Sequence, residues 1–274
     1  MTVATKHRLI ATLLCYRGNV VQTRRFRPTN MVGNAFTAVD FFNSWAVDEI
    51  CVLEISADDS YLDHFLEVVH GLSRRCFVPL SVGGKIRDLD KVREYTRAGA
   101  DKVVLNTHAY QSDSLIEDVA GSFGKQCVVV SVDAAPNPDM PSGYEAVIAR
   151  GREKTGEDVN TWVLRAAQRG AGEILLNNIE HDGDKRGYDL SLIKSVTAVS
   201  PIPVIAFGGV ANWDHLVEGI EVGGADAVAA GNIFHYTEHS TKKAKEHMAA
   251  QGLWVRDSTF YKVDMPRRPT YQPY

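Results

Sequence analysis

A short pattern occurs twice in the chain at an offset of 125 residues (83 to 208, 99 to 224). Gly-Gly stands at 83–84 and at 208–209, each time directly after an apolar run. Gly-Ala-Asp stands at 99–101 and at 224–226, each time before the next apolar run. A strand–helix unit of a parallel barrel takes about 30 residues, so a repeat of this length holds about four units and the chain about eight. The repeat predicts an α/β chain folded as a (β/α)8 TIM barrel with an internal half-barrel duplication.

Short apolar runs rich in β-branched residues alternate with segments of helical periodicity. Near-continuous apolar runs are typical of parallel strands that are covered by helices. The predicted strands are Leu9–Leu14, Ile50–Ile55, Val78–Val82, Lys102–Asn106, Cys127–Val132, Glu173–Asn178, Pro203–Phe207 and Ala227–Gly231. The predicted helices are Phe36–Trp45, Tyr61–Leu72, Leu89–Arg97, Ser114–Ser122, Val159–Arg169, Leu190–Val196, Trp213–Val222 and Ser240–Gln251. This alternation favours a parallel sheet.

Length and composition predict one domain. With 274 residues, 45% of them hydrophobic, the chain can bury a large core, and we expect a single barrel over residues 1–251. Residues 252–274, with prolines among tyrosines and arginines, are expected as an extended C-terminal extension. A net charge of −4 gives no reason to expect a nucleic-acid partner, and no apolar run suits a membrane span or a signal peptide. The four cysteines lack pairing or metal-type spacing, which favours a reducing, cytoplasmic location, and neither a metal nor a cofactor is expected.

Sites in this class of barrel form at the carboxyl ends of the strands. Gly84-Lys85 and Asn106-Thr107 reach that end in the first half, and Gly208-Gly209 and Gly231-Asn232 reach it in the second. A Gly-Gly turn leaves backbone N–H groups free to bind an oxyanion and lets a phosphate approach closely. Glycines at strand ends also form ordinary tight turns. Two related turns, one in each half, favour a ligand with two phosphates.

Asp133 is the candidate catalytic residue. It ends an otherwise apolar strand, where a charge is costly unless it faces the barrel mouth. It is interpreted as a general acid or base, and a loop cap or simple hydrogen-bond acceptor is the alternative. The matching end of the first strand is Leu14, which cannot transfer a proton.

Four charged residues stand at or just before strand starts, at the opposite end of the barrel: Arg8, Glu49, Lys102 and Glu173. Two cations and two anions at this level can form a ring that closes the barrel floor. From the residues alone, the structural interpretation, a ring that stabilises the lower face, takes precedence over a functional one.

Two segments fall outside the strand–helix alternation. The loop after the first strand carries arginines around Phe26, in the stretch Gln22–Pro28. It suits an anionic, nucleotide-bearing ligand or is only a solvated basic loop. Ala134–Asp158, which contains Pro136, Pro138 and Pro141, is expected as a long insertion over the mouth after the fifth strand.

Several segments resemble one enzyme family over about residues 7 to 250. They are the strand Val128–Asp133, the run Gly170–Leu176, Asp182-Gly183 with Gly187–Asp189, and the strand Ile205–Gly209. These segments look like the cyclase subunit of imidazole glycerol phosphate synthase, a barrel that works with a glutaminase subunit.

The resemblance implies a function for the floor ring and adds residues to the mouth. In that family, ammonia from the glutaminase enters through the barrel floor and crosses to the mouth, and all four ring residues match its charged gate. The first phosphate site maps to Gly84-Lys85 with Asn106-Thr107. The second maps to Asp182-Gly183, Gly208-Gly209 and Gly231-Asn232.

Three positions depart from the pattern of that family. The family has a second catalytic aspartate where Leu14 stands, a loop lysine where Gln22 stands, and a third glycine where Lys85 stands. Leu13-Leu14 and the stretch from Gln22 to Gly33 look more like a paralogous branch, the acetamidino-modification proteins of nucleotide-sugar and surface-polysaccharide pathways. In that branch, the resemblance implies a glutaminase partner and a separate sugar amidotransferase.

The leading hypothesis is an ammonia-conducting barrel subunit of a glutamine amidotransferase system, with the cyclase activity lost. It would serve the amidination of a nucleotide sugar or another phosphorylated small molecule in lipopolysaccharide biosynthesis. Whether the chain catalyses a step by itself stays open. One alternative is an active cyclase, a lyase of histidine biosynthesis. Another is a non-catalytic scaffold that holds a glutaminase and an amidotransferase together.

Overall fold

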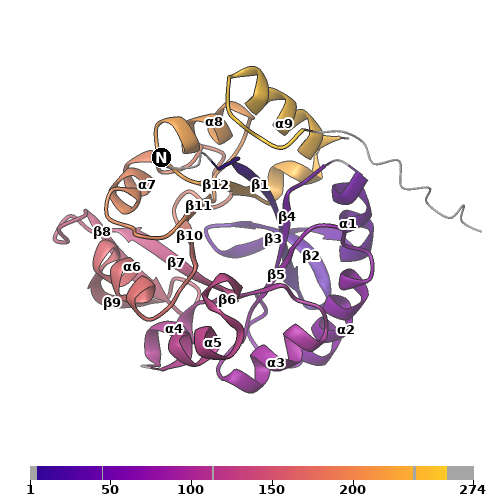
Figure 1. The fold of residues 1–274 in the computed structure, drawn as a ribbon, viewed down its shortest axis with the longest axis horizontal. Helices are drawn as coiled ribbons and strands as arrows, with labels where there is room; N and C mark the ends of the chain where they lie inside the picture. The colour runs from indigo at the N-terminus through magenta and orange to yellow at the C-terminus, as the bar shows by residue number, and fades with distance from the viewer. Residues whose placement is uncertain (1–4, 45, 113, 237–238, 258–274) are drawn as a thin grey trace, which may run out of the picture.

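The computed structural model describes residues 5–44, 46–112, 114–236 and 239–257. Within them, parallel strands close into an eight-stranded barrel, because the fifth barrel strand, β7, also pairs with the sixth, β10 (Figure 1). In chain order the barrel strands are β1 (Arg8–Tyr16), β4 (Glu49–Glu54), β5 (Leu80–Gly83), β6 (Lys102–Leu105), β7 (Val128–Pro136), β10 (Glu173–Asn178), β11 (Val204–Phe207) and β12 (Ala227–Ala230). β1 pairs in parallel with β4 and with β12, so the first and the last barrel strands are neighbours. The predicted (β/α)8 barrel is confirmed.

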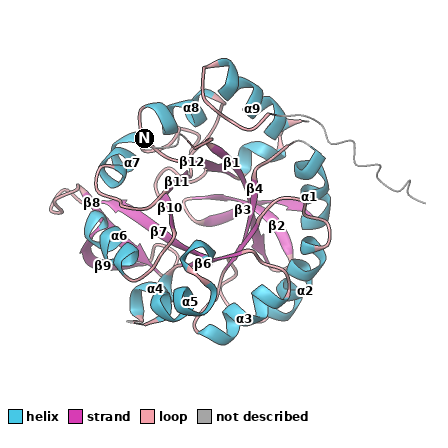
Figure 2. Ribbon diagram, viewed as in Figure 1, coloured by secondary structure: helices cyan, strands magenta, loops and turns pink. Residues whose placement is uncertain are grey.

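Helices surround the barrel on its outside (Figure 2). They are α1 (Ala35–Ser44), α2 (Leu62–Ser73), α3 (Leu89–Arg97), α4 (Thr107–Gln111), α5 (Leu115–Phe123), α6 (Val159–Gln168), α7 (Leu190–Thr197), α8 (Asp214–Glu221) and α9 (Ser240–Ala250), with the 3₁₀ turns η1 (Lys125–Cys127) and η2 (Asn232–His235). Aspartate caps start three of them: Asp88 accepts from a backbone N–H of α3, Asp158 from two of α6, and Asp189 from one of α7. None of the helices in the described ranges combines the length and apolarity that a bilayer crossing requires.

Strand alternation divides the core into an outer and an inner layer. On β1, Leu9, Ala11 and Leu13 pack with the helices, and Ile10 belongs to the inner layer. The inner layer lines the barrel lumen and consists of Ile10, Cys51, Val104, Val129, Leu175, Ile205, Ala227 and Ala229. The lumen is therefore apolar along its middle.

The repeated Gly-Ala-Asp segments lock neighbouring strands together at the floor. Asp101, just before β6, accepts a hydrogen bond from Leu80 N (2.8 Å) and donates its own N–H to Leu80 O (2.9 Å). Asp226, just before β12, makes the same two bonds with Val204 (2.8 and 3.0 Å). The repeat in the sequence thus marks a repeated strand-to-strand bond in each half-barrel.

A third aspartate makes this bond and also holds the end of the described chain. Asp48, before β4, accepts from Leu9 N (2.9 Å) and pairs with Lys245 of α9 (2.6 Å). Arg256, in the segment Gly252–Asp257, pairs with the same carboxylate (3.0 Å). This segment therefore contacts the barrel floor, and the rest of the expected extension, from 258 onward, lies outside the described residues.

Two hairpins replace segments that we expected to be irregular. The loop after β1 forms β2 (Asn19–Arg24) and β3 (Arg27–Gly33), and the insertion after β7 contains β8 (Tyr144–Ile148) and β9 (Glu153–Asp158). The turn between β2 and β3 is Arg25-Phe26, with φ of 50° and 60°. Such turns usually carry Asn-Gly, and β3 is exposed nearly throughout. The sequence of the β2–β3 hairpin therefore carried neither the usual turn residues nor a buried apolar face on β3.

Candidate functional site

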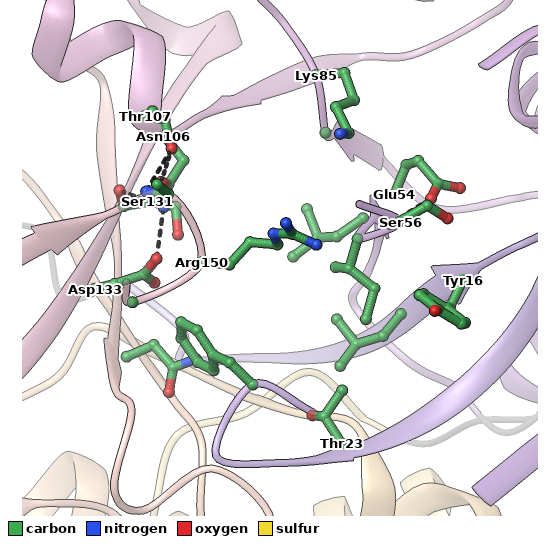
Figure 3. A pocket seen from close by; sticks show the side chains of 18 of the residues that line it. Tyr16, Thr23, Glu54, Ser56, Lys85, Asn106, Thr107, Ser131, Asp133 and Arg150 are labelled. Carbon is green, nitrogen blue, oxygen red and sulfur yellow. Dashed lines mark hydrogen bonds between the residues drawn. The ribbon is translucent and has the colours of Figure 1, made fainter. Parts of the chain in front are cut away.

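A cavity of about 600 Å³ opens at the carboxyl ends of the barrel strands. Figure 3 shows Asn106 and Asp133 on one wall, Lys85 and Glu54 on the other, and Arg150 between them. The tip of the β2–β3 hairpin and the β8–β9 turn also line it, so both segments that fall outside the strand–helix alternation shape the site. A cavity of this size suits a ligand as large as a nucleotide.

Asp133 faces this cavity from the end of β7 and is only 7% exposed. Asn106 Nδ2 donates a hydrogen bond to Asp133 Oδ2 (2.9 Å). Burial raises the pKa of Asp133 to about 7, although the bond from Asn106 opposes the shift and the charge of Asp182 adds to it. Near neutral pH this carboxyl group can therefore both accept and donate a proton.

Leu14 lines the same cavity from β1, so this wall offers no titratable group at that position. The nearest acidic candidate along the neighbouring strand is Glu54, whose Oε1 accepts from Ser56 N (2.7 Å). Its Oε2 is buried without a hydrogen-bond partner among the described residues, and burial raises the pKa of Glu54. Figure 3 shows the Glu54 carboxyl group turned away from Asp133. Glu54 therefore does not stand in for the missing aspartate.

The first-half residues of the expected phosphate site all line this cavity, Gly84-Lys85 after β5 and Asn106-Thr107 after β6. Gly84 has a φ of 111°, and a Cβ there would lie 2.4 Å from Glu54 O, so only glycine fits. Lys85 Nζ donates to Ala57 O (2.9 Å) and lies 3.5 Å from Asp59. Thr107 Oγ1 donates to Asn106 Oδ1 (3.2 Å) and accepts from Ala149 N (3.0 Å), which ties this wall to the β8–β9 turn.

The second-half residues surround a much smaller hollow of about 80 Å³, lined by Asp182, Gly183, Gly208, Gly209, Gly231 and Asn232. Strand β2 packs directly on it. Asn232 Nδ2 donates to Thr23 O (2.9 Å), and a Cβ on Gly183 would lie 2.1 Å from that same oxygen. The two expected phosphate sites are therefore unequal: one opens into the large cavity and the other is partly covered.

The β2–β3 hairpin is fastened to the loop after β10. Asp182 accepts from Thr23 Oγ1 and Phe26 N (both 2.9 Å), and its own carbonyl accepts from Arg25 N (2.8 Å). Asp184 pairs with Arg24 (2.6 Å) and Arg25 (2.8 Å), and these hydrogen bonds lower the pKa of Asp184 to about 2. Two arginines of the basic stretch, Arg24 and Arg25, thus form ion pairs with the protein itself, while their side chains stay exposed.

Among the cavity residues that were not singled out from the sequence is Arg150. It stands in a turn of the insertion whose position in space no local pattern indicated. Asn177 stands near the end of the predicted strand Glu173–Asn178, at the level where mouth residues are expected. It lies beside Asp133, and its Oδ1 is buried without a hydrogen-bond partner among the described residues. Its place at a strand end was the one available signal.

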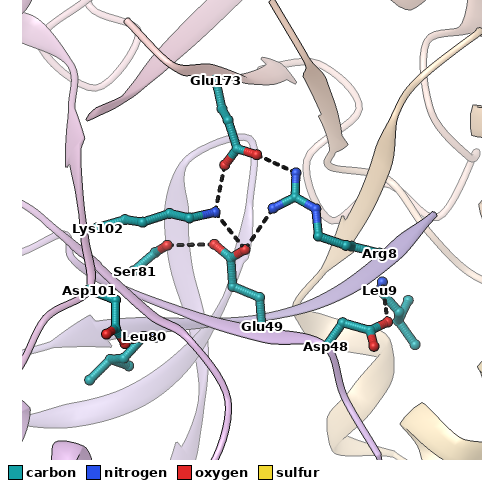
Figure 4. Close-up of polar contacts among 9 residues, drawn as sticks. All are labelled: Arg8, Leu9, Asp48, Glu49, Leu80, Ser81, Asp101, Lys102 and Glu173. Atoms are coloured by element: carbon teal, nitrogen blue, oxygen red, sulfur yellow. Dashed lines mark hydrogen bonds and ion pairs between the residues drawn. The ribbon is translucent and has the colours of Figure 1, made fainter. Parts of the chain in front are cut away.

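At the floor, the four charged residues form a closed ring (Figure 4). Arg8 pairs with Glu49 (2.8 Å) and with Glu173, and Lys102 pairs with Glu49 (2.9 Å) and Glu173 (2.7 Å). Ser81 Oγ also donates to Glu49 Oε1 (2.5 Å). Each cation therefore bridges both anions, and the ring closes the barrel axis below the apolar lumen.

Comparison with known proteins agrees with this geometry. The model of the family described as "Histidine biosynthesis protein" matches residues 8–240. The chain is also similar to a protein of Vibrio vulnificus (strain YJ016) named "Putative imidazole glycerol phosphate synthase subunit hisF2". The two are 41% identical over 259 residues, which cover 94% of this chain and 94% of that protein. The chain therefore belongs to the histidine biosynthesis protein family, among barrels that are like the cyclase subunit of imidazole glycerol phosphate synthase.

Proposed function

We propose that this chain is the ammonia-conducting barrel subunit of a glutamine amidotransferase system. A glutaminase subunit docks on the floor around Arg8, Glu49, Lys102 and Glu173, and ammonia crosses the lumen to the cavity at Asp133. There, or on a separate sugar amidotransferase, the ammonia is used to amidinate a nucleotide sugar. The histidine-pathway cyclase reaction is lost.

The closed charge ring below an apolar lumen carries this proposal. Neutral ammonia crosses an apolar layer at far lower cost than ammonium or another ion. The ring excludes water from the lumen while it stays closed, and separating its ion pairs opens a path. On the floor side, Phe77 and Trp254 are 69% and 51% exposed, as suits a face that a partner covers.

Leu14 supports the loss of cyclase activity. General acid–base catalysis by a positioned group contributes about 10²–10⁴-fold to a rate, and leucine cannot supply it. Glu54 points away from Asp133 and does not replace it. One half of the proton-transfer machinery that the family resemblance implies is therefore missing.

The test supplies the purified chain with ammonium and the ribulosyl-formimino substrate of the cyclase. We expect no measurable imidazole glycerol phosphate, whereas an authentic cyclase run in parallel forms it. The matched variant Leu14→Asp restores the second carboxylate. Any imidazole glycerol phosphate that it forms assigns part of the lost cyclase activity to position 14. Robust product from the unaltered chain would discard the proposal.

The active cyclase is the second candidate, and Asp133 is the observation that favours it. Its raised pKa, close to 7, and its bond from Asn106 suit proton transfer, and the open phosphate site lies on the same cavity. A third outcome, a scaffold without ammonia transfer, is separated by mixing the chain with a glutaminase. Unchanged glutamine hydrolysis in the complex would favour the scaffold, and activation supports ammonia conduction.

A further inference from the structure

Arg150 is a half-buried cation that lines the cavity without a partner. Figure 3 shows its guanidinium group extended into the middle of the space, between the wall of Asn106 and the wall of Lys85. It has no hydrogen bond or ion pair with any residue that the structure describes. Three other cations of the same cavity are paired, Lys85 and Arg87 with Asp59 and Arg25 with Asp184. Arg27 and Arg152 also line it, but both are exposed, whereas Arg150 is half-buried.

The turn that carries Arg150 holds an unfavourable backbone conformation. Ala149, Arg150 and Gly151 have φ of 52°, 63° and 73°, a left-handed run that costs energy at the two non-glycine positions. Ala149 N donates to Thr107 Oγ1, so the turn is fixed to the wall of the open phosphate site. The protein therefore maintains strain to place one unpaired guanidinium group beside that site.

The covered second phosphate site restricts how a ligand can lie. Its hollow of about 80 Å³ adjoins Asn232, which is bonded to Thr23, and Gly183, which is in close contact with the same residue. A ligand with one phosphate at each end would have to place one of them in this small hollow, next to the contacts of Thr23. A ligand whose anionic groups are adjacent fits the open cavity as it stands.

We propose that the cavity binds a ligand with two adjacent phosphates, as in a nucleoside diphosphate, and that Arg150 is the specificity-determining residue. The turn at Gly84 with Asn106-Thr107 binds one phosphate, and the guanidinium of Arg150 binds the other through its planar pair of donors. The inference rests on the proposed function for the identity of the acceptor and deepens it, because a nucleotide sugar carries this diphosphate.

The test measures binding by calorimetry, with ADP, inorganic phosphate and a linear alkane bisphosphate as the probes. We expect the unaltered chain to bind ADP more tightly than the bisphosphate. Arg150→Ala should weaken ADP binding about tenfold or more and leave inorganic phosphate within about twofold. Arg150→Lys keeps the charge and loses the planar pair of donors. Its affinity for ADP should lie between those of the unaltered chain and of Arg150→Ala. The matched control is Arg97→Ala, at an exposed arginine of α3 that does not line the cavity, with a change below about threefold.

Three results would overturn the inference. The first is no measurable ADP binding, and the second is tighter binding of the bisphosphate than of ADP. The third is an equal loss of affinity for ADP and for inorganic phosphate in Arg150→Ala. Thermal unfolding of each variant confirms that the fold is intact before binding is compared. The cyclase and glutaminase assays test the proposed function, not the binding of a diphosphate. If they contradict ammonia conduction while ADP binding still depends on Arg150, the proposed function fails and the diphosphate site stands.

Discussion

At the scale of single residues, the site depends on one carboxyl group in an unusual environment. Asp133 is buried at the mouth and accepts a bond from an amide, not from a cation. Leu14 stands where the family resemblance implies a second carboxyl group, and Arg150 adds a cation to the same cavity. In the proposed function, the chemistry of this mouth shifts from paired proton transfer towards anion binding.

The raised pKa of Asp133 predicts a pH-dependent cost in stability. Its folded-state pKa of about 7 lies above the ordinary 3.8, so the folded protein holds this proton more tightly than the unfolded chain. The associated stability is present at low pH and is lost as pH rises from about 4 to 7, by roughly 4 kcal/mol at most. The stability of Asp133→Asn relative to the unaltered chain should therefore be higher at pH 8 than at pH 5.

Urea unfolding at the two pH values measures this gain. Asp139→Asn, at an exposed aspartate in the loop between β7 and β8, is the control, and its difference from the unaltered chain should not depend on pH. If Asp133→Asn showed the same stability difference at both values, the carboxyl group would not be buried as a neutral acid at neutral pH.

At the scale of elements, hydrophobic periodicity predicted the strands and helices of the barrel but not the two hairpins, β2–β3 and β8–β9. Helix α3 and strand β10 begin and end where the pattern placed them, because α3 has one polar and one apolar face and β10 has an apolar run, Ile174–Leu176, bounded by polar residues. The β2–β3 hairpin could not be found in this way. Its turn is Arg25-Phe26, and its left-handed backbone is held by Asp182 and Asp184, which lie far away in sequence.

The strand-locking aspartates give a prediction at this scale. Asp48→Ala removes the acceptor of Leu9 N and leaves Lys245, only 1% exposed, without its carboxylate partner. Breaking one partner of a buried ion pair costs about 3–5 kcal/mol, so we expect a loss of about 3 kcal/mol or more in the free energy of unfolding. Asp101→Ala removes the same strand bond without a buried lysine and should cost only about 1 kcal/mol.

Chemical denaturation of the two variants gives the comparison. Equal losses would mean that Lys245 finds another partner once Asp48 is removed, with Ala46 O, which it already contacts, as the first candidate.

At the scale of the whole molecule, the barrel separates two ends with different tasks. The sequence placed residues correctly on the floor and on the mouth, because strand starts and strand ends of a parallel barrel fall on opposite faces. It could not show that the second of the two expected phosphate sites is partly covered. That outcome depends on Thr23 meeting Asp182 and Asn232, contacts that span 159 and 209 residues of chain. Local patterns carry no information on such long-range packing.

The floor ring provides the prediction that joins the two ends. Lys102→Ala leaves Glu49, whose side chain is 3% exposed, with Arg8 and Ser81 as its remaining partners. Because the ring also faces solvent, we expect a folded protein with a stability loss of about 1–3 kcal/mol. With the ring open, ammonia escapes and water enters, so more glutamine should be hydrolysed by the partner glutaminase for each ammonia transferred.

Glutamate release and product formation, measured together in the reconstituted complex, give this ratio. Lys91→Ala removes a half-buried lysine of α3 that pairs with Glu94 and lies over the ring of Tyr95, away from the floor ring, and should leave the ratio unchanged. A Lys102→Ala protein that loses stability yet keeps the ratio of the unaltered complex would assign the ring to support of the floor alone. A raised ratio in a folded variant would require the ring to control passage, since the cavity and Asp133 lie at the other end of the barrel, beyond the apolar lumen.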